Sequence, residues 1–207
     1  QVSEQEARDF IETMLVDTER LSDLIDNILE SSKSDLKSMQ LQFKLVDVVS
    51  ILRETVEHHK RLFEDKQCLI RLQFDSQPKV NVDTKAIRMV FNNLIANALR
   101  YSPAGSSLDI HVGKDEKFCN INFIDQGFGF DKKELKRVFK KFYRVQNQET
   151  QSIEGAGLGL YISRQIIKSH EGRINAFSEG RGKGTRFMVS LPLNSSINKK
   201  AKKKLIE

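Results

Sequence analysis

The chain has 207 residues, of which 39% are hydrophobic and 30% are charged, a composition typical of a soluble globular protein. No apolar run approaches the roughly 18 residues that a membrane-spanning helix needs, which excludes such a helix from this sequence. The formal net charge is +6, but much of the excess lies in a short polar tail, residues 194–207, expected to be disordered. The lysines of this tail are Lys199, Lys200, Lys202, Lys203 and Lys204.

The remaining composition points to a cytoplasmic protein that does not bind nucleic acid. Cys68 and Cys119 lie in strand-like runs without metal-ligand spacing, so both are expected to be buried, reduced thiols. Aromatic and basic residues do not alternate along any strand, as they do on nucleic-acid-binding surfaces. The sequence starts at Gln1, inside a helical pattern and without a signal peptide. We therefore read it as a fragment that contacts a membrane only through N-terminal parts outside it.

Residues 1 to about 36 predict one long, coiled-coil-like helix. Its apolar residues follow alternating steps of three and four, close to a heptad pattern, and the rest of the surface is strongly charged. These apolar residues are Phe10, Met14, Leu21, Leu24, Ile25 and Ile28. Such a narrow stripe favours a partner helix from a hairpin or a second subunit, although a single arm packed on its own domain is the alternative. We assign residues 1–40 to this helix and a linker.

Residues 41–82 predict a short strand, a helix and two further strands. The strand covers 41–45, and Asp47 is suited to cap the following helix. Along this helix His59 falls on the apolar stripe, so a packed, hydrogen-bonded histidine is a better interpretation than a catalytic one. Strands are expected at 68–74 and 79–82.

The helix predicted at residues 83–101 carries two stripes. Asp83 is a plausible N-cap, and Pro103 disfavours helix at the preceding residue, so the helix should end near Tyr101. The apolar stripe consists of Ile87, Val90, Phe91, Leu94, Ile95 and Ala98. A second stripe, roughly 100° around the helix, consists of Met89, Asn93, Asn97 and Arg100. Two asparagines and a cation there suit a hard metal ion and an anionic substrate, but a solvated helix edge fits equally well.

The strand predicted at 118–125 ends in a carboxylate on its apolar side. Cys119, Ile121, Phe123 and Asp125 share one face by the two-residue period of a strand. A buried carboxylate is costly without hydrogen-bond donors, and nearby glycines let another molecule approach the backbone. Asp125 is therefore more consistent with a ligand-binding role than with a plain turn.

The C-terminal half predicts helices and strands around glycine-rich turns. We expect a strand at 107–112, a short helix at 131–141, a mobile loop at 146–154 and a helix that ends at Gly172. Three alternate glycines, in Gly155–Leu160, open this helix and could cradle a phosphate, although glycine turns also occur without ligands. A hairpin of strands, 173–178 and 185–191, closes an α+β two-layer sandwich over residues 41–193.

Four of these elements, in this order, resemble the catalytic ATP-binding domain of sensor histidine kinases. They are the two asparagines, the Asp125–Gly129 turn, the glycines before a helix, and Gly182-Lys183-Gly184-Thr185 before a strand. The wider family includes the gyrase, Hsp90 and MutL ATPase domains. The resemblance covers about residues 1–192 and implies the Bergerat ATP-binding fold, with ATP and Mg²⁺ as ligands.

The resemblance also implies a role for each matching position. Asn97 matches the residue that ligates Mg²⁺, whereas Asn93 and Arg144 match catalytic positions beside the phosphates. Asp125 matches the carboxylate that accepts the adenine amino group, and residues 146–154 would form an ATP lid. The nucleotide-binding positions are Asn93, Asn97, Arg100, Tyr101, Asp125, Gly127, Gly129, Val138, Tyr143, Arg144, Gly155, Gly157, Leu158, Gly159, Leu160 and Thr185.

The first helix resembles the second helix of the kinase dimerisation hairpin, whose other helix carries the phosphorylated histidine in this family. None of the four histidines here has that motif, so the fragment should bind ATP without phosphorylating itself. The resemblance implies a phosphoacceptor helix of the same or a second subunit, a response regulator receiver domain and a full-length homodimer. It implies two-component signalling by phosphorelay.

Two other functions remain open. In gyrase-like and Hsp90-like ATPases a glutamate, the base for water, lies four residues before the metal-binding asparagine, and this chain has Asn93 there. Rapid hydrolysis is therefore not expected. A degenerate dimerisation scaffold is the second alternative, and the intact glycines, asparagines and Asp125 argue against it.

Overall fold

The computed structural model of this protein describes residues 41–145 and 155–193. The chain divides into two units, Gln1–Ser38 and Met39–Glu207, and the described residues all belong to the second. The predicted long helix, the lid loop at 146–154 and the basic tail lie outside the described residues. Within these ranges no helix combines the length and apolar character needed to cross a membrane.

A five-stranded mixed sheet forms one layer of the fold, in the order β2-β4-β5-β7-β6. Only β2 and β4 run parallel, and the other neighbours are antiparallel. The strands of this sheet are β2 (Leu69–Phe74), β4 (Ser107–Lys114), β5 (Phe118–Asp125), β6 (Arg173–Phe177) and β7 (Thr185–Pro192). A separate antiparallel pair consists of β1 (Phe43–Asp47) and β3 (Lys79–Asp83).

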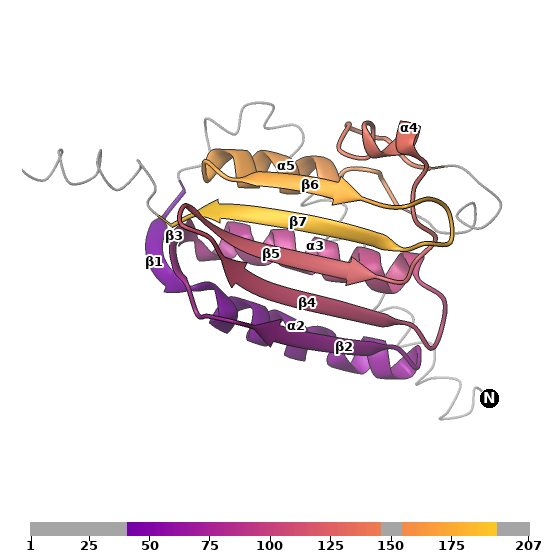
Figure 1. The fold of residues 1–207 in the computed structure, drawn as a ribbon, viewed down its shortest axis with the longest axis horizontal. Coiled ribbons are helices and arrows are strands. Elements are labelled where there is room, and N and C mark those ends of the chain that lie inside the picture. The colour runs from indigo at the N-terminus through magenta and orange to yellow at the C-terminus, as the bar shows by residue number, and fades with distance from the viewer. Residues whose placement is uncertain (1–40, 146–154, 194–207) are drawn as a thin grey trace, which may run out of the picture. The chain divides into compact units, whose positions relative to one another are not determined.

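Three helices form the second layer and cover one face of the sheet (Figure 1). They are α2 (Val48–Asp65), α3 (Thr84–Tyr101) and α5 (Gly159–Ser169), and a short helix, α4 (Lys132–Leu135), follows β5. A mixed sheet with helices on one face confirms the predicted α+β two-layer sandwich.

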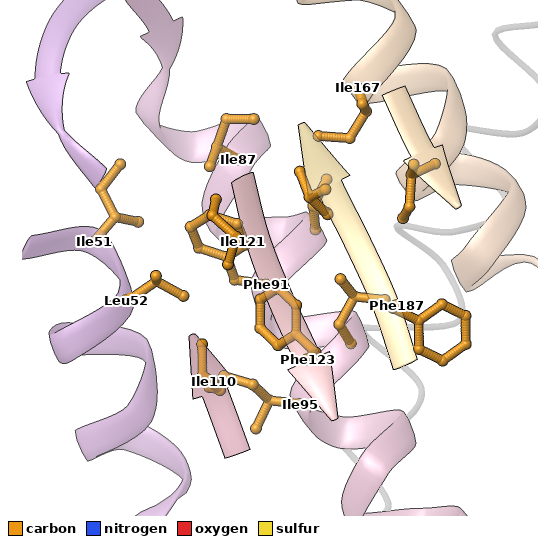
Figure 2. Close-up of a cluster of buried hydrophobic side chains, with 14 of the residues drawn as sticks. Ile51, Leu52, Ile87, Phe91, Ile95, Ile110, Ile121, Phe123, Ile167 and Phe187 are labelled. Atoms are coloured by element: carbon orange, nitrogen blue, oxygen red, sulfur yellow. The ribbon is translucent and has the colours of Figure 1, made fainter. Parts of the chain in front are cut away.

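The core lies between α3 and the sheet. The apolar stripe of α3 is buried along its whole length, as its period predicts. Figure 2 shows Ile87, Phe91 and Ile95 on the side of α3 that faces the strands, and the ring centroids of Phe91 and Phe123 lie 5.7 Å apart. Burial of this stripe fixes which face of α3 points inward and so leaves its polar stripe at the helix edge.

The start of α3 is held by an aspartate and a histidine. Asp83 accepts a hydrogen bond from the Ala86 N–H at 3.0 Å, which confirms the predicted N-cap. His170 accepts from the Asp83 N–H through Nε2 at 3.0 Å and donates from Nδ1 to the Ile166 carbonyl at 2.7 Å. Burial lowers the pKa of His170, which keeps the ring neutral. His170 is therefore structural and joins α5 to the β3–α3 junction.

The structure also bears out the expectations for the other buried polar residues. His59 is 7% exposed and hydrogen-bonds through Nδ1 to the Thr55 carbonyl at 3.0 Å, so it is a packed histidine. Cys68 and Cys119 are both buried and free, and burial raises the pKa of the Cys119 thiol to about 12. The Cys119 thiol is therefore not a reactive nucleophile.

The helix after β5 is shorter than its pattern suggested, whereas the helix after the glycine turn begins where that turn ends. The helix expected at 131–141 spans only Lys132–Leu135, with turns after it, so that prediction was wrong in length. A capping box of Asp131 and Glu134 fixes its start, but four residues make barely one turn. The glycine-rich helix begins at Gly159, because Gly157 has a left-handed φ of +67° that α-helix does not allow.

The end of α5 differs in detail from the prediction at Gly172. Glu171, with a φ of +58°, takes the left-handed position, and the Gly172 N–H bonds to the Ile167 carbonyl at 2.9 Å. A Cβ at Gly172 would lie 2.6 Å from the Ser190 carbonyl oxygen of β7. Gly172 is therefore needed for close approach to the sheet and not for a left-handed turn.

Candidate functional site

The end of β5 places a buried carboxylate beside the start of β7. Asp125 is 9% exposed, and its Oδ1 accepts hydrogen bonds from the Gly127 N–H at 2.8 Å and the Thr185 N–H at 3.0 Å. Burial raises the pKa of Asp125 to about 6, although the two hydrogen bonds act in the opposite direction. The predicted inward parity of Asp125 is confirmed, and both of its described hydrogen bonds fall on one oxygen.

The turn after Asp125 packs against the end of α3. The Phe128 N–H donates to the Tyr101 carbonyl at 3.0 Å. A Cβ on Gly127 would lie 2.6 Å from that carbonyl oxygen and 2.8 Å from Asp125 Oδ1, distances that real Cβ atoms do not adopt. Gly127 is therefore required where the turn, the helix end and the carboxylate meet. Gly184 holds the turn from the other side, since its N–H donates to the Gly127 carbonyl at 3.0 Å.

The polar stripe of α3 faces the glycine turn before α5. The side-chain amide of Asn93 donates to the Ser163 hydroxyl at 2.9 Å, and Gly159 packs directly against Asn93 Oδ1. At the other end of the turn, the Cβ position of Gly155 lies 3.4 Å from a guanidinium nitrogen of Arg100. Asn93 and Ser163 thus meet although they lie 70 positions apart in the chain. The polar stripe of α3 therefore packs against the start of α5 and is not fully exposed to solvent.

The glycine turn also touches the Phe142-Tyr143-Arg144 segment. The Cβ position of Gly157 lies 2.9 Å from the carbonyl carbon of Phe142 and 3.1 Å from the Cγ of Arg144. Phe142 itself has a left-handed φ of +60°, which is uncommon for a residue other than glycine and recurs at functional sites. Tyr143 is half-buried, and the Arg137 guanidinium lies 4.6 Å from its ring centroid.

The remaining predicted site residues line the periphery or support it from inside. Asn97 is half-buried on the same edge of α3 as Asn93, and Leu160 is half-buried in the first turn of α5. Val138 and Leu158 are 4% and 2% exposed and belong to the hydrophobic core. Gly129 has a φ of +66° and packs against the Gly180 and Gly184 carbonyls.

Three residues of this region were given no role of their own from the sequence, although Gln126 and Gly184 belong to two of the motifs. Ser163 holds Asn93, Gly184 packs against the Asp125 carbonyl, and Gln126 accepts a hydrogen bond from the Ser107 N–H at 2.9 Å. Ser163 lies one turn after Gly159, so helix spacing could have placed it on the same face. Gln126 and Gly184 had no such signal beyond their positions in the glycine-rich turns.

The donor chemistry limits which ligands this site could hold. Across the part of the chain that the structure describes, no three His, Cys, Asp or Glu side chains gather closely enough to hold a metal ion. A cation here would need amide oxygen, water and the ligand's own oxygens, a set that suits Mg²⁺, which keeps several waters. The Asn97 side chain, on the edge that faces the glycine turn, fits such a role.

Comparisons with known proteins agree with this geometry. Residues 82–195, more than half of the chain, match the family described as "Histidine kinase-, DNA gyrase B-, and HSP90-like ATPase". The sensor histidine kinase WalK of Bacillus subtilis is 34% identical over 178 residues, which cover 85% of this chain and 29% of WalK. The chain thus spans less than a third of the length of this relative.

Two solved structures share the fold at lower sequence identity. Full-length ShkA in complex with AMPPNP superposes with a TM-score of 0.75 at 19% identity, over 93% of this chain and 40% of that one. The histidine kinase ThkA in complex with the response regulator TrrA superposes with a TM-score of 0.71 at 21% identity, over 94% of this chain and 53% of the ThkA chain. At these identities the likeness establishes the fold alone.

Proposed function

This chain belongs to the family of histidine kinase-, DNA gyrase B- and HSP90-like ATPases as an ATP-binding domain of the histidine kinase type, and we propose that the protein it comes from transfers the γ-phosphoryl group of ATP to a histidine. In the reaction, the bond between the γ-phosphorus and the bridging oxygen breaks while an imidazole nitrogen bonds to phosphorus. ADP leaves, and the imidazole proton passes to solvent. The histidine would come from a segment outside the residues 41–193 that form this domain.

The observation that carries the proposal is the anchored carboxylate at the end of β5. Two backbone N–H groups hold Asp125 Oδ1, so the carboxylate has a fixed orientation and its other oxygen is available for a donor. The adenine amino group is such a donor. No residue with a side chain would fit at position 127, and the glycine there would let the purine lie close to the backbone.

The phosphate end of the nucleotide would lie along α3 and the glycine turn. The first N–H groups of α5 have no partner within the helix and no side-chain cap from Leu158, which favours an anion there, and Arg100 and Arg144 contribute positive charge. Asn97 would ligate Mg²⁺ by its amide oxygen, and a bound Mg²⁺ would offset charge on the phosphate oxygens. Asn93, on the same edge of α3 as Asn97, would orient the phosphates.

The chemistry of Asn93 supports transfer to a protein over hydrolysis. An amide cannot accept the proton of an attacking water, and its nitrogen is already bonded to the Ser163 hydroxyl. Without a general base the site would leave water largely unactivated. The gyrase-like ATPase alternative is therefore less well supported than the kinase.

We further propose the partners and the domain division. Residues 1–40 would dimerise through a helical hairpin, residues 41–193 would bind ATP, and residues 194–207 would form a basic tail. ThkA was solved in complex with its response regulator. By analogy, the phosphohistidine would pass its phosphoryl group to an aspartate of a receiver domain, in the cytoplasm.

Calorimetric titration with Mg-ATP tests the proposal directly. Wild-type protein should bind, while Asn97→Ala should lose the dependence of binding on Mg²⁺ and Asp125→Ala should lose adenine binding. Asp115→Ala is a matched control, because Asp115 accepts from the Lys117 and Phe118 N–H groups at the opposite end of β5 from Asp125. A wild-type melting temperature that millimolar nucleotide leaves unchanged would instead favour the dimerisation scaffold.

A further inference from the structure

The C-terminal end of α3 is held by a lysine from another helix. Lys66 is the C-cap residue of α2, and its Nζ donates to the carbonyl of Leu99 at 2.6 Å and to that of Ser102 at 2.7 Å. The last carbonyls of a helix lack partners within it and form the negative end of the helix dipole. The lysine ammonium supplies both a donor and a compensating charge, so it fixes the point where the chain leaves α3.

The turn that ends α2 brings Lys66 to this position. Gln67 takes a left-handed φ of +56°, and its N–H donates to the Glu64 carbonyl at 2.8 Å. The N–H of Cys68 donates to the Phe63 carbonyl at 2.7 Å, which completes a Schellman motif. The Cys68 thiol then contacts the Pro103 carbonyl at 3.5 Å. The end of α2 is thus packed onto the chain that follows α3.

The two carbonyls that Lys66 holds lie on either side of Tyr101. The Tyr101 carbonyl accepts the hydrogen bond from the Phe128 N–H, and the neighbouring Gly127 packs against the same oxygen. The Gly127 N–H in turn holds the Asp125 carboxylate. A continuous set of contacts therefore runs from Lys66, through the end of α3, to the turn that would hold the purine.

We propose that Lys66 is a positioning residue for the adenine end of the nucleotide site. It touches neither the nucleotide nor Asp125, and acts by holding the Tyr101 carbonyl where Phe128 can bond to it. The proposal rests on the proposed function. Because the effect is at the base and not at the phosphates, loss of Lys66 should weaken ATP and ADP binding by the same factor.

The same pair of helices provides a matched control. Arg88 of α3 pairs with Glu54 of α2 at 2.6 Å, toward the other end of α3, and this pair is exposed. Arg88→Met therefore removes a cation that also joins α2 to α3, but leaves the Tyr101 carbonyl untouched. Exposed pairs of this kind contribute little to stability.

The experiment compares Lys66→Met and Arg88→Met by calorimetry with Mg-ATP and Mg-ADP, and by hydrogen exchange at the Phe128 N–H without nucleotide. We expect Lys66→Met to weaken the binding of both nucleotides about tenfold, as loss of a charged hydrogen bond would. Hydrogen exchange at the Phe128 N–H should also become faster. The affinity of Arg88→Met for both nucleotides should lie within about twofold of the wild-type affinity. Lys66→Arg, which keeps the cation and its donors, should restore most of the affinity.

The possible failures are distinguishable. If Lys66→Met matches Arg88→Met in affinity and in Phe128 exchange, Lys66 is not a positioning residue, while wild-type binding still supports the proposed function. If wild type binds neither nucleotide, the proposed function is wrong, and the Phe128 exchange still tests the contact with Lys66. If Lys66→Met does not fold, Lys66→Gln replaces it, and wild-type affinity in that variant would overturn the inference.

Discussion

The side-chain amide of Asn93 donates to the hydroxyl of Ser163 at 2.9 Å, and this bond joins α3 to α5 beside the glycine turn. Because the amide nitrogen is used, the amide oxygen is directed at Gly159. The orientation of Asn93 is therefore set by a residue of the neighbouring helix. Two elements that would hold the phosphates are fixed relative to each other before any nucleotide binds.

Ser163→Ala should loosen this arrangement. The variant leaves the half-buried Asn93 amide without its partner, which should cost about 1 kcal/mol of unfolding free energy, or about 2–4 °C in melting temperature. Affinity for Mg-ATP should fall several-fold, measured by calorimetry. Ser169→Ala is the control, because among the described residues the Ser169 hydroxyl bonds to the Gln165 carbonyl, within α5 itself. Equal losses of affinity in the two variants would contradict a specific role for Ser163.

Asp125→Asn should stabilise the fold at neutral pH. Burial raises the pKa of Asp125 from 3.8 to about 6, so between these values the folded state holds the proton more tightly than the unfolded state does. Stability from this group is present at low pH and is lost as pH rises through 6. The free energy of unfolding of the variant should therefore exceed that of wild type above pH 6, by up to about 3 kcal/mol, and match it below pH 3.8.

Urea unfolding of both proteins across this pH range gives the measurement. The other titrating groups, His170 among them, are common to both proteins, so the difference isolates Asp125. A difference that does not vary with pH would contradict the raised pKa. Nucleotide binding should show the opposite preference, since a proton on the oxygen that the backbone leaves available would remove the acceptor for the adenine amino group. Wild-type affinity for ADP should therefore rise from pH 5 to 7.

Gly127→Ala should disrupt the site and the fold together. The added methyl group would lie 2.6 Å from the Tyr101 carbonyl oxygen and 2.8 Å from Asp125 Oδ1, and both oxygens are held by hydrogen bonds. We expect the free energy of unfolding to fall by about 2 kcal/mol, or the melting temperature by roughly 4–8 °C, and we expect no measurable ADP binding. Gly113→Ala is the control, because its nearest neighbour is an Asp75 oxygen at an ordinary 3.5 Å. A Gly127→Ala protein that melts like this control would contradict the close packing described for the turn.

Gln67→Gly should stabilise the protein. Gln67 is exposed and left-handed at the end of α2, a conformation that costs residues with a Cβ about 1 kcal/mol or more and that glycine adopts freely. Thermal melting should show a rise of about 2–4 °C. Gln67→Ala keeps the Cβ and should show no rise. An equal gain in both variants would locate the effect in the lost side chain instead of the backbone.

Local features of the sequence determined the elements and their inward faces. The stripe on α3, its Asp83 cap and its end before Pro103 follow from residues within one helix. The parity of β5 placed Asp125 on the buried side because side chains alternate along a strand. Since such rules depend on neighbours in the chain, the sequence alone predicted these features and the order of the motifs.

Only the tertiary structure decided which residues meet. Asn93 reaches Ser163 across 70 positions, Thr185 holds Asp125 across 60, and Lys66 caps α3 across 33. No periodicity encodes such pairs, because they depend on how the helices pack on the sheet and where the turns direct the chain. The sequence overestimated the length of α4, because Val138 and Phe139 fit a helical spacing but are buried from the turns that follow Leu135. Burial of these two side chains therefore did not show how far the helix extends.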